Sequence, residues 1–268
     1  YGAEVVVCPT AVPPDHPDTE RILHRSRSKK FAAYVGCAKW NKSDLKNFYP
    51  RGTKDELAYY SSQFNCIELN ATFYRLFPAA QFETWRDTVP KGFKFFPKLG
   101  QEISHWKRLQ GVEKIVDKYV GNYSLLEKRL GAIFLQLHSN FGPKDLGRVQ
   151  KFLADWQYDA RLAVEFRHPD WFGVPEIADE IFKLLQRKRA LQVLVDTAGR
   201  RDMLHMRLTA PAAFIRWVGA NHPSDVTRLD EWVERIAAWK EQGLRELYFF
   251  VHQNVELESP LLAAHVTT

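Results

Sequence analysis

The sequence predicts an α/β protein: a single TIM-type (β/α)8 barrel with an N-terminal arm. The chain has 268 residues, which is typical of one such barrel. After about residue 31, apolar runs of strand length alternate with amphipathic stretches of helix length, a rhythm typical of parallel βα units. Eight strand-like runs occur, and eight is the number that closes a barrel.

The expected strands are nearly continuous apolar runs, as parallel strands buried on both faces should be. They cover residues 32–37, 66–70, 93–98, 132–137, 162–166, 191–196, 213–218 and 246–252. Helices are expected between them, over residues 53–63, 79–88, 112–129, 145–156, 174–187 and 228–242. Thr53 and Glu56 resemble a capping box, and Gly243 is a natural residue to follow a helix.

The first 30 residues differ from the rest and form the predicted N-terminal arm. Pro9, Pro13, Pro14 and Pro17 make residues 9–20 a loop or extended segment, and no signal peptide is recognised. Residues 31–268 then form one barrel domain, because no internal repeat or second composition class interrupts them.

Composition is ordinary for a soluble globular protein, with 45% hydrophobic and 26% charged residues and no apolar run long enough to cross a membrane. The three cysteines, Cys8, Cys37 and Cys66, lack CxxC spacing. They argue against a disulfide framework or zinc knuckle and fit a reducing compartment, so a cytoplasmic location is expected.

The chain is basic, with 38 Lys and Arg against 32 Asp and Glu, a net charge of +6 and a pI near 9.1. This charge favours anionic partners, either small ligands or nucleic acid, although many mildly basic proteins have neither. The densest basic run, Arg187-Lys188-Arg189, ends a predicted helix, where cations complement the helix dipole.

The working face of such a barrel lies where its strands end. Polar side chains stand at nearly every predicted strand end, whereas the strand beginnings are apolar or unremarkable. The catalytic candidates are Glu68, Glu165, His168 and Asp196. The candidates for substrate binding are Trp40, Asn70, Tyr74, Lys98, His105, Gln136, Arg167, Trp171, Arg216, His252 and Asn254.

The segment Glu165-Phe166-Arg167-His168 is the most informative part of this face. Alternation along a strand points Glu165 and Arg167 the same way, so the guanidinium would keep the carboxylate ionised as a base or ligand. Arginine also suits phosphate or carboxylate, and His168, held extended by Pro169, could transfer protons near neutral pH. Alternatively, Glu68, Glu165, Arg167 and Arg216 form a purely structural ion network.

Alternation also places Glu68 and Asn70 on one face, and Asp196 would complete a set of three inward carboxylates. With His168 or His252, this set could hold a divalent metal, but no metal-binding spacing is present, so the cofactor stays unknown.

Aromatic residues crowd the same predicted face, and core packing accounts for about half of them. The others suit a sugar ring or a base. The whole aromatic set comprises Trp40, Phe73, Tyr74, Trp106, Trp171 and Trp217. The sequence has no Walker A, GxGxxG or GxSxG motif, which disfavours nucleotide-fold kinases, dehydrogenases and serine hydrolases.

Two motifs carry a family resemblance: Glu68-Leu69-Asn70-Ala71-Thr72-Phe73-Tyr74 and Val164-Glu165-Phe166-Arg167-His168-Pro169 with Trp171. With Tyr34-Val35-Gly36-Cys37 and shorter matches up to residue 254, the chain resembles the YecE-like family, known as domain of unknown function 72. The resemblance implies a TIM-type barrel but no settled activity. The chain departs from the family pattern at Ala38-Lys39, His138-Ser139, Trp217-Val218 and Val251-His252, all at strand ends.

Two functional hypotheses follow. The first is an enzyme, a hydrolase or isomerase, acting on a phosphorylated, sugar-containing or nucleic-acid substrate, with Glu165 and His168 as proton-transfer groups and Lys98, Arg167 and Arg216 holding the anion. The second is a barrel that binds a small anion or nucleic acid without chemistry.

Overall fold

Parallel strands form the centre of the molecule. The computed structural model describes residues 10–26, 30–45 and 47–267. Their nine strands are β1 (Ala32–Cys37), β2 (Cys66–Leu69), β3 (Lys94–Pro97), β4 (Ile133–Gln136), β5 (Leu162–Glu165), β6 (Leu191–Gln192), β7 (Leu194–Thr197), β8 (Ala212–Val218) and β9 (Glu246–His252). All pairings between these strands are parallel, which confirms the α/β class.

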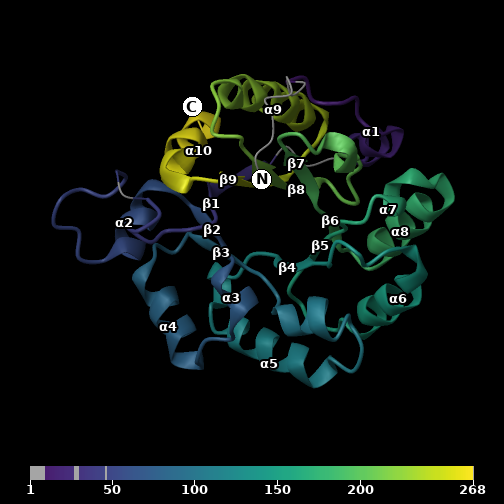
Figure 1. Cartoon of the computed structure of the whole chain (residues 1–268), viewed down its shortest axis with the longest axis horizontal. Helices are drawn as coiled ribbons and strands as arrows, with labels where there is room; N and C mark the ends of the chain where they lie inside the picture. The colour runs from purple at the N-terminus through teal and green to yellow at the C-terminus, as the bar shows by residue number, and fades with distance from the viewer. Residues whose placement is uncertain (1–9, 27–29, 46, 268) are drawn as a thin grey trace.

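The hydrogen bonding divides the strands into two sheets. One has six strands in the order β3-β2-β1-β9-β8-β7, and the other has three in the order β4-β5-β6. Isolated bridges from Phe95 to Leu130 and from Lys98 to Phe134 connect β3 with β4, and Val193 alone separates β6 from β7. The regular pairing thus gives two sheets and not the single closed sheet that the sequence predicts. Figure 1 shows the strands around the centre and the helices outside them.

The helices confirm most of the sequence expectation. They are α2 (Glu56–Gln63), α4 (Ala79–Thr88), α5 (Glu113–Ser124), α6 (Leu146–Asp155), α8 (Pro175–Arg187) and α9 (Ser224–Gln242). The expected start of α2 is wrong, because Asp55 and not Thr53 caps it by accepting the Ala58 N–H at 2.9 Å. Gly243 follows α9 with φ of 122°, a conformation that glycine adopts without strain.

Short helices that the periodicity did not predict fill several loops. They are α1 (Pro17–His24), α3 (Ala71–Tyr74), α7 (Asp170–Gly173), α10 (Ser259–Thr267) and the π-helical turn η1 (Glu102–Trp106). The expected loop over residues 9–20 is therefore wrong from Pro17 onward, where proline at a first helical position begins α1. Asp18 of α1 pairs with Arg207, and the Thr19 hydroxyl donates to the Met206 carbonyl at 2.9 Å. Cys8 and Pro9 lie outside the described residues.

A layer of phenylalanines fills the interior between the two ends of the strands. Phe96, Phe134, Phe214 and Phe250 are fully buried, with ring centroids 5.0–5.9 Å apart in consecutive contacts. Each phenylalanine stands two residues before a polar residue, and residues two apart on a strand point to the same side. These polar residues are Lys98, Gln136, Arg216 and His252. This apolar layer separates the carboxyl ends of the strands from their amino ends.

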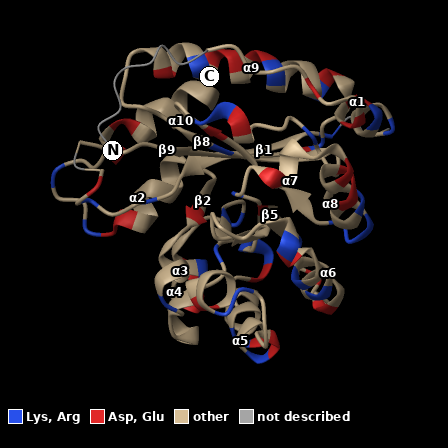
Figure 2. Cartoon of the chain, turned by 45° about the vertical axis from the view of Figure 1, so that its right-hand side comes forward, with Lys and Arg blue, Asp and Glu red and all other residues tan. Residues whose placement is uncertain are grey.

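Charge on the outside is mixed. Figure 2 shows Lys and Arg interspersed with Asp and Glu along outer helices such as α8 and α9. Arg187, at the end of α8, is exposed, as the sequence predicts for a cation at a helix C-terminus. None of the described helices combines the length and apolar character needed to span a bilayer.

Candidate functional site

Six polar residues gather at the carboxyl ends of the strands, and we call them the mouth cluster. They are Glu68, Lys98, Gln136, Glu165, Arg216 and His252, from β2, the residue after β3, β4, β5, β8 and β9. Arg216 connects them. Its Nε and Nη2 donate to the two oxygens of Glu68 at 2.9 and 3.0 Å, and its Nη1 donates to Oε2 of Glu165 at 2.7 Å.

Burial makes these ion pairs strong. Glu68 has no exposed surface and Glu165 only 2%. Burial by itself would raise the pKa of Glu68, but the charges of Arg216 and His252 reverse this effect and hold the pKa below its usual value. The two carboxylates likewise raise the pKa of Arg216 against the effect of its burial. Glu68 and Arg216 therefore stay ionised throughout the physiological range.

Lys98 extends the cluster through Gln136. The Gln136 amide donates to Oε1 of Glu165 at 2.9 Å and accepts from Nζ of Lys98 at 2.9 Å. The ammonium also lies 4.0 Å above the ring centroid of Phe73, a cation–π distance. Lys98 is 6% exposed, and no described carboxylate lies within 4.0 Å of it. Burial and the charge of Arg216 lower its pKa to about 8.

His252 closes the cluster on the side of β9. Its Nε2 is 3.1 Å from Oε2 of Glu68 and 3.4 Å from Nη2 of Arg216. The shorter distance fits an Nε2–H that donates to the carboxylate, which leaves Nδ1 as the second ring nitrogen. A carboxylate that orients a histidine in this way is a recurrent arrangement in proton transfer.

Arg167 and His168 lie at the rim. β5 ends at Glu165, yet Nε of Arg167 is still 3.7 Å from Oε1 of Glu165, so the predicted juxtaposition stands. The Arg167 side chain is 44% exposed and has room for another partner. His168 is half-buried, its Nδ1 accepts the Asp170 N–H at 3.2 Å, and no hydrogen bond or ion pair connects it to Glu165 among the described residues. Glu68, Glu165, Arg167 and Arg216, the four residues of the predicted ion network, are thus connected by ion pairs.

His105 lies next to the cluster but is not a cation. Burial, with the nearby charges of His138 and Lys98, lowers its pKa to about 4. Its ring is 5.0 Å from those of Phe73 and His138, and its Nδ1 is 2.8 Å from the Ser104 hydroxyl. His105 can therefore contact a ligand only as a neutral donor or acceptor.

The remaining binding candidates differ in exposure. Tyr74 is 72% exposed, and Trp106, two residues from Ser104 in η1, is 69% exposed. Asn70 is half-buried and stands at the start of α3, where its side chain makes no capping hydrogen bond. Because β2 ends at Leu69, the predicted strand alternation of Asn70 with Glu68 is wrong. Trp40 is half-buried against Trp85, and Asn254 is exposed.

Asp196 is not part of this site, contrary to the prediction. It is fully buried, and its carboxylate accepts from Arg201, from Arg228 at 2.8 Å and from the Trp232 indole at 2.7 Å. Val195 is the residue of β7 that contacts the interior layer, so Asp196 faces the surrounding helices. Arg201 and Arg228 lower the pKa of Asp196 although burial opposes them. This carboxylate has a structural role.

Trp171, a predicted binding residue, and Trp217, one of the aromatic residues expected on the same face, are core residues. Trp171 is fully buried, and its indole donates to the Phe141 carbonyl at 2.7 Å. Trp217 is fully buried and alternates with the inward-facing Arg216, so it lies under α9, where Arg228 covers its ring at 4.7 Å. Neither can form the wall of a binding site.

With Asp196 removed, the proposed three-carboxylate set does not assemble. Among the described residues, no group of three or more His, Cys, Asp or Glu is placed to hold a metal ion. Phe134 also contributes to the site, although nothing in the sequence pattern predicts this. This residue sits under both cations, 4.9 Å from the Arg216 guanidinium and 5.5 Å from the Lys98 ammonium, but in the sequence it is one apolar residue in an apolar run.

Fold and site together define a parallel α/β protein with a buried ionic cluster at the carboxyl ends of its strands. A family model described as "Protein of unknown function DUF72" matches residues 34–268, and the chain belongs to this family. The UPF0759 protein YecE of Escherichia coli K12 is 27% identical over 251 residues, covering 85% of this chain and 89% of that protein. The UPF0759 protein YunF of Bacillus subtilis is 28% identical over 53% of each chain. The predicted YecE-like membership is confirmed.

Solved structures of the same family share the fold. A DUF72 family protein from Thermotoga maritima superposes with a TM-score of 0.73 at 22% identity, covering 88% of this chain and 97% of that one. One from Enterococcus faecalis V583 gives 0.73 at 16% identity, covering 90% and 98%. At these identities the comparison concerns the fold alone.

Proposed function

We propose that the mouth cluster binds a small phosphorylated sugar and that the protein is an enzyme of the hydrolase or isomerase class. The observation that carries the proposal is Lys98, a buried ammonium without a carboxylate within 4.0 Å among the described residues. Leaving a buried charge unpaired is costly, and an anionic ligand removes that cost. Arg216 is already committed to two glutamates, so Lys98 and the partly exposed Arg167 are the cations for the ligand.

The aromatic side chains beside the cluster support a sugar as the rest of the ligand. Phe73 covers Lys98, and the adjacent Tyr74 is exposed, as is Trp106 next to His105. Exposed aromatic faces beside a few fixed polar groups suit a sugar ring.

His252 is the group for proton transfer. Glu68 fixes the ring through Nε2, which leaves Nδ1 as the nitrogen that would exchange a proton with the ligand. Glu165 has both oxygens engaged, by Gln136 and Arg216, so it positions the cluster. This assignment replaces the pair of Glu165 and His168 that the sequence favoured.

Isothermal titration with glucose 6-phosphate, fructose 6-phosphate and ribose 5-phosphate tests the binding, with glucose as the uncharged control. Lys98→Met should weaken phosphate binding at least about tenfold, which is about 1.4 kcal/mol. Lys151→Met, an exposed lysine of α6, should change nothing. Equal affinity of Lys98→Met and the unchanged protein would contradict the proposal.

Turnover separates the enzyme from the non-catalytic alternative. NMR detects both release of phosphate and interconversion of the two hexose phosphates. His252→Gln should abolish turnover and leave affinity within about threefold, because it removes the proton carrier and not the anion-binding cations. Binding of these ligands without any turnover would favour a barrel that binds an anion and performs no chemistry.

We also propose that residues 31–268 form one closed (β/α)8 barrel in the reducing environment of the cytoplasm, with residues 1–30 as an arm. The links across the β3–β4 junction support closure: the Leu99 N–H donates to Phe134 at 2.8 Å and the Gly131 N–H to Phe95 at 2.7 Å. The buried, unpaired thiols Cys37 and Cys66 support a reducing compartment. Slow hydrogen exchange at the Leu99 and Gly131 amides is expected, and rapid exchange there would indicate an open junction.

A further inference from the structure

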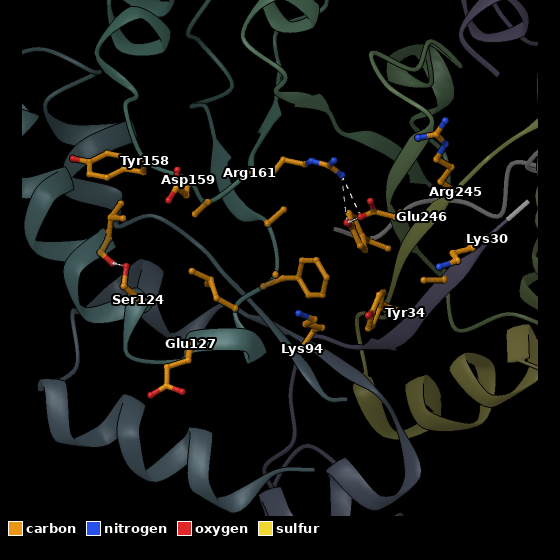
Figure 3. A pocket seen from close by; sticks show the side chains of 18 of the residues that line it. Lys30, Tyr34, Lys94, Ser124, Glu127, Tyr158, Asp159, Arg161, Arg245 and Glu246 are labelled. Atoms are coloured by element: carbon orange, nitrogen blue, oxygen red, sulfur yellow. Dashed lines mark hydrogen bonds and ion pairs between the residues drawn. The ribbon is translucent and has the colours of Figure 1, made fainter. Parts of the chain in front are cut away.

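The amino ends of the strands are not the unremarkable surface that the sequence predicts. A cavity of about 1240 Å³ opens there, at the opposite end from the mouth cluster. Tyr34 of β1, Lys94 of β3, Arg161 just before β5 and Tyr248 of β9 line it. Figure 3 shows Tyr34, Lys94 and Arg161 around a common space. The polar character was missed because Tyr34, Lys94 and Tyr248 each stand within an apolar run and Arg161 stands just before one.

Three aromatic rings form the floor of this cavity. Phe96 lies 4.8 Å from Tyr248 and 6.3 Å from Tyr34, and the two tyrosines are 5.9 Å apart, all measured between ring centroids. Phe96 is fully buried, whereas Tyr34 is half-buried and faces the cavity. Tyr34 can therefore offer its ring to a planar group, while the buried Phe96 and Tyr248 hold that ring in place.

Two cations beside this floor have unused capacity. Lys94 is half-buried, its Nζ donates to the Lys128 carbonyl, and no described carboxylate lies within 4.0 Å of it. Arg161 uses Nη1 for Glu246 at 3.2 Å and for the Tyr248 hydroxyl at 3.4 Å. Within the described residues, nothing bonds its Nε or Nη2, so one edge of the guanidinium is open to a carboxylate.

We propose that this cavity is a second ligand site, specific for a small aromatic carboxylate. The ring would lie on the half-buried Tyr34, whose own ring packs against the buried Phe96, and the carboxylate would face Lys94 and the open edge of Arg161. Stacking alone would accept any planar molecule, and charge alone any anion. The combination of the two selects for both properties in one ligand.

The site is independent of the mouth cluster. The buried layer of Phe96, Phe134, Phe214 and Phe250 lies between the two ends. No residue of the mouth cluster lines the cavity. Failure of either proposal therefore leaves the other standing.

Isothermal titration and saturation-transfer NMR with 1-naphthoate and benzoate test the proposal. Binding with a Kd of about 1 mM or tighter is expected. Lys94→Met and Arg161→Gln should each weaken it about five- to tenfold, and Tyr34→Leu should weaken it through loss of stacking. Arg167→Gln, at the mouth, is the matched control and should leave it unchanged. Thermal unfolding confirms that each variant is folded.

Three results would overturn the proposal. The first is no binding of either probe at about 10 mM, a concentration that would half-saturate even a very weak site. The second is unchanged affinity in both Lys94→Met and Arg161→Gln. The third is equal binding of cyclohexanecarboxylate, which has the charge without the aromatic ring, or of naphthamide, which has the ring without the charge.

Discussion

Arg216 and Glu68 form a two-point ion pair across the interior, with Nε to Oε2 at 2.9 Å and Nη2 to Oε1 at 3.0 Å. The residues come from β8 and β2 and are 148 positions apart in the sequence. Both side chains are at least 90% buried, so each depends on the other for compensation of its lost hydration. Arg216 also donates to Glu165, so this one guanidinium is hydrogen-bonded to two carboxylates.

Arg216→Met should therefore destabilise the protein by about 3–5 kcal/mol at pH 7, the usual cost of leaving a buried charge unpaired. Chemical unfolding measures this loss. Without the guanidinium, burial raises the pKa of Glu68, so the variant should regain stability as the pH falls from 7 to 5. The unchanged protein should show no such gain, because its Glu68 has a pKa below the usual value of 4.5.

Arg187→Met, at the exposed end of α8, is the matched control for this experiment and should cost less than about 1 kcal/mol. A loss of similar size in both variants, or the same pH dependence in both, would show that the Arg216 pairs do not stabilise the fold.

Lys98 gives the proposed phosphate site a pH dependence. The side chain is a cation below its pKa of about 8 and neutral above it. A phosphomonoester is already doubly charged above pH 7. Affinity for glucose 6-phosphate should therefore fall as the pH rises above 8, by up to about tenfold per pH unit. Titrations between pH 7 and 9.5 measure this.

Lys98→Arg tests the cause of that dependence. Arginine keeps its charge over the whole range, so the decline above pH 8 should disappear in this variant if it binds the ligand. An identical decline in both proteins would assign the titration to another group.

The members of the mouth cluster could be predicted from the sequence, because each is a polar residue in or just after the last part of an apolar run and the topology brings these strand ends together. All six were named as candidates: Glu68, Lys98, Gln136, Glu165, Arg216 and His252. The sequence left open whether Arg216 holds a ligand or forms an ion network with Glu68 and Glu165, and the structure shows that it donates to both glutamates. The contact of His252 with Glu68, 184 positions away, was not predicted.

Asp196 and Trp171 show why the remaining site residues could not be predicted. A parallel strand covered by helices is apolar on both faces, so alternation does not reveal which face points inward. Val195 and Asp196 are equally compatible with the interior until the structure is known. Trp171 follows a strand end as a binding residue would, but α7 turns it into the core.

Asp196 should affect stability and not the mouth. Asp196→Ala leaves the fully buried Arg228 without its 2.8 Å partner, so a loss of about 3–5 kcal/mol is expected. Asp202→Ala removes an exposed ion pair with Arg200 and should cost at most about 1 kcal/mol. Urea unfolding compares the two. Loss of phosphate binding in a fully stable Asp196→Ala protein would instead return Asp196 to the site.

Gly36 of β1 stands opposite Cys66 in the register between β1 and β2. A Cβ at this position would lie 2.2 Å from the Cys66 carbonyl oxygen and 2.9 Å from the Tyr60 hydroxyl. The carbonyl belongs to the backbone of a paired strand and cannot turn away, so Gly36→Ala must push β1 and β2 apart. We expect a loss of about 3 kcal/mol, the upper part of the range for overpacked cores.

Gly92→Ala is the matched control, because nothing lies within 4 Å of its Cβ. Thermal unfolding should show a lower midpoint for Gly36→Ala alone, and equal midpoints would mean that the two strands separate without cost.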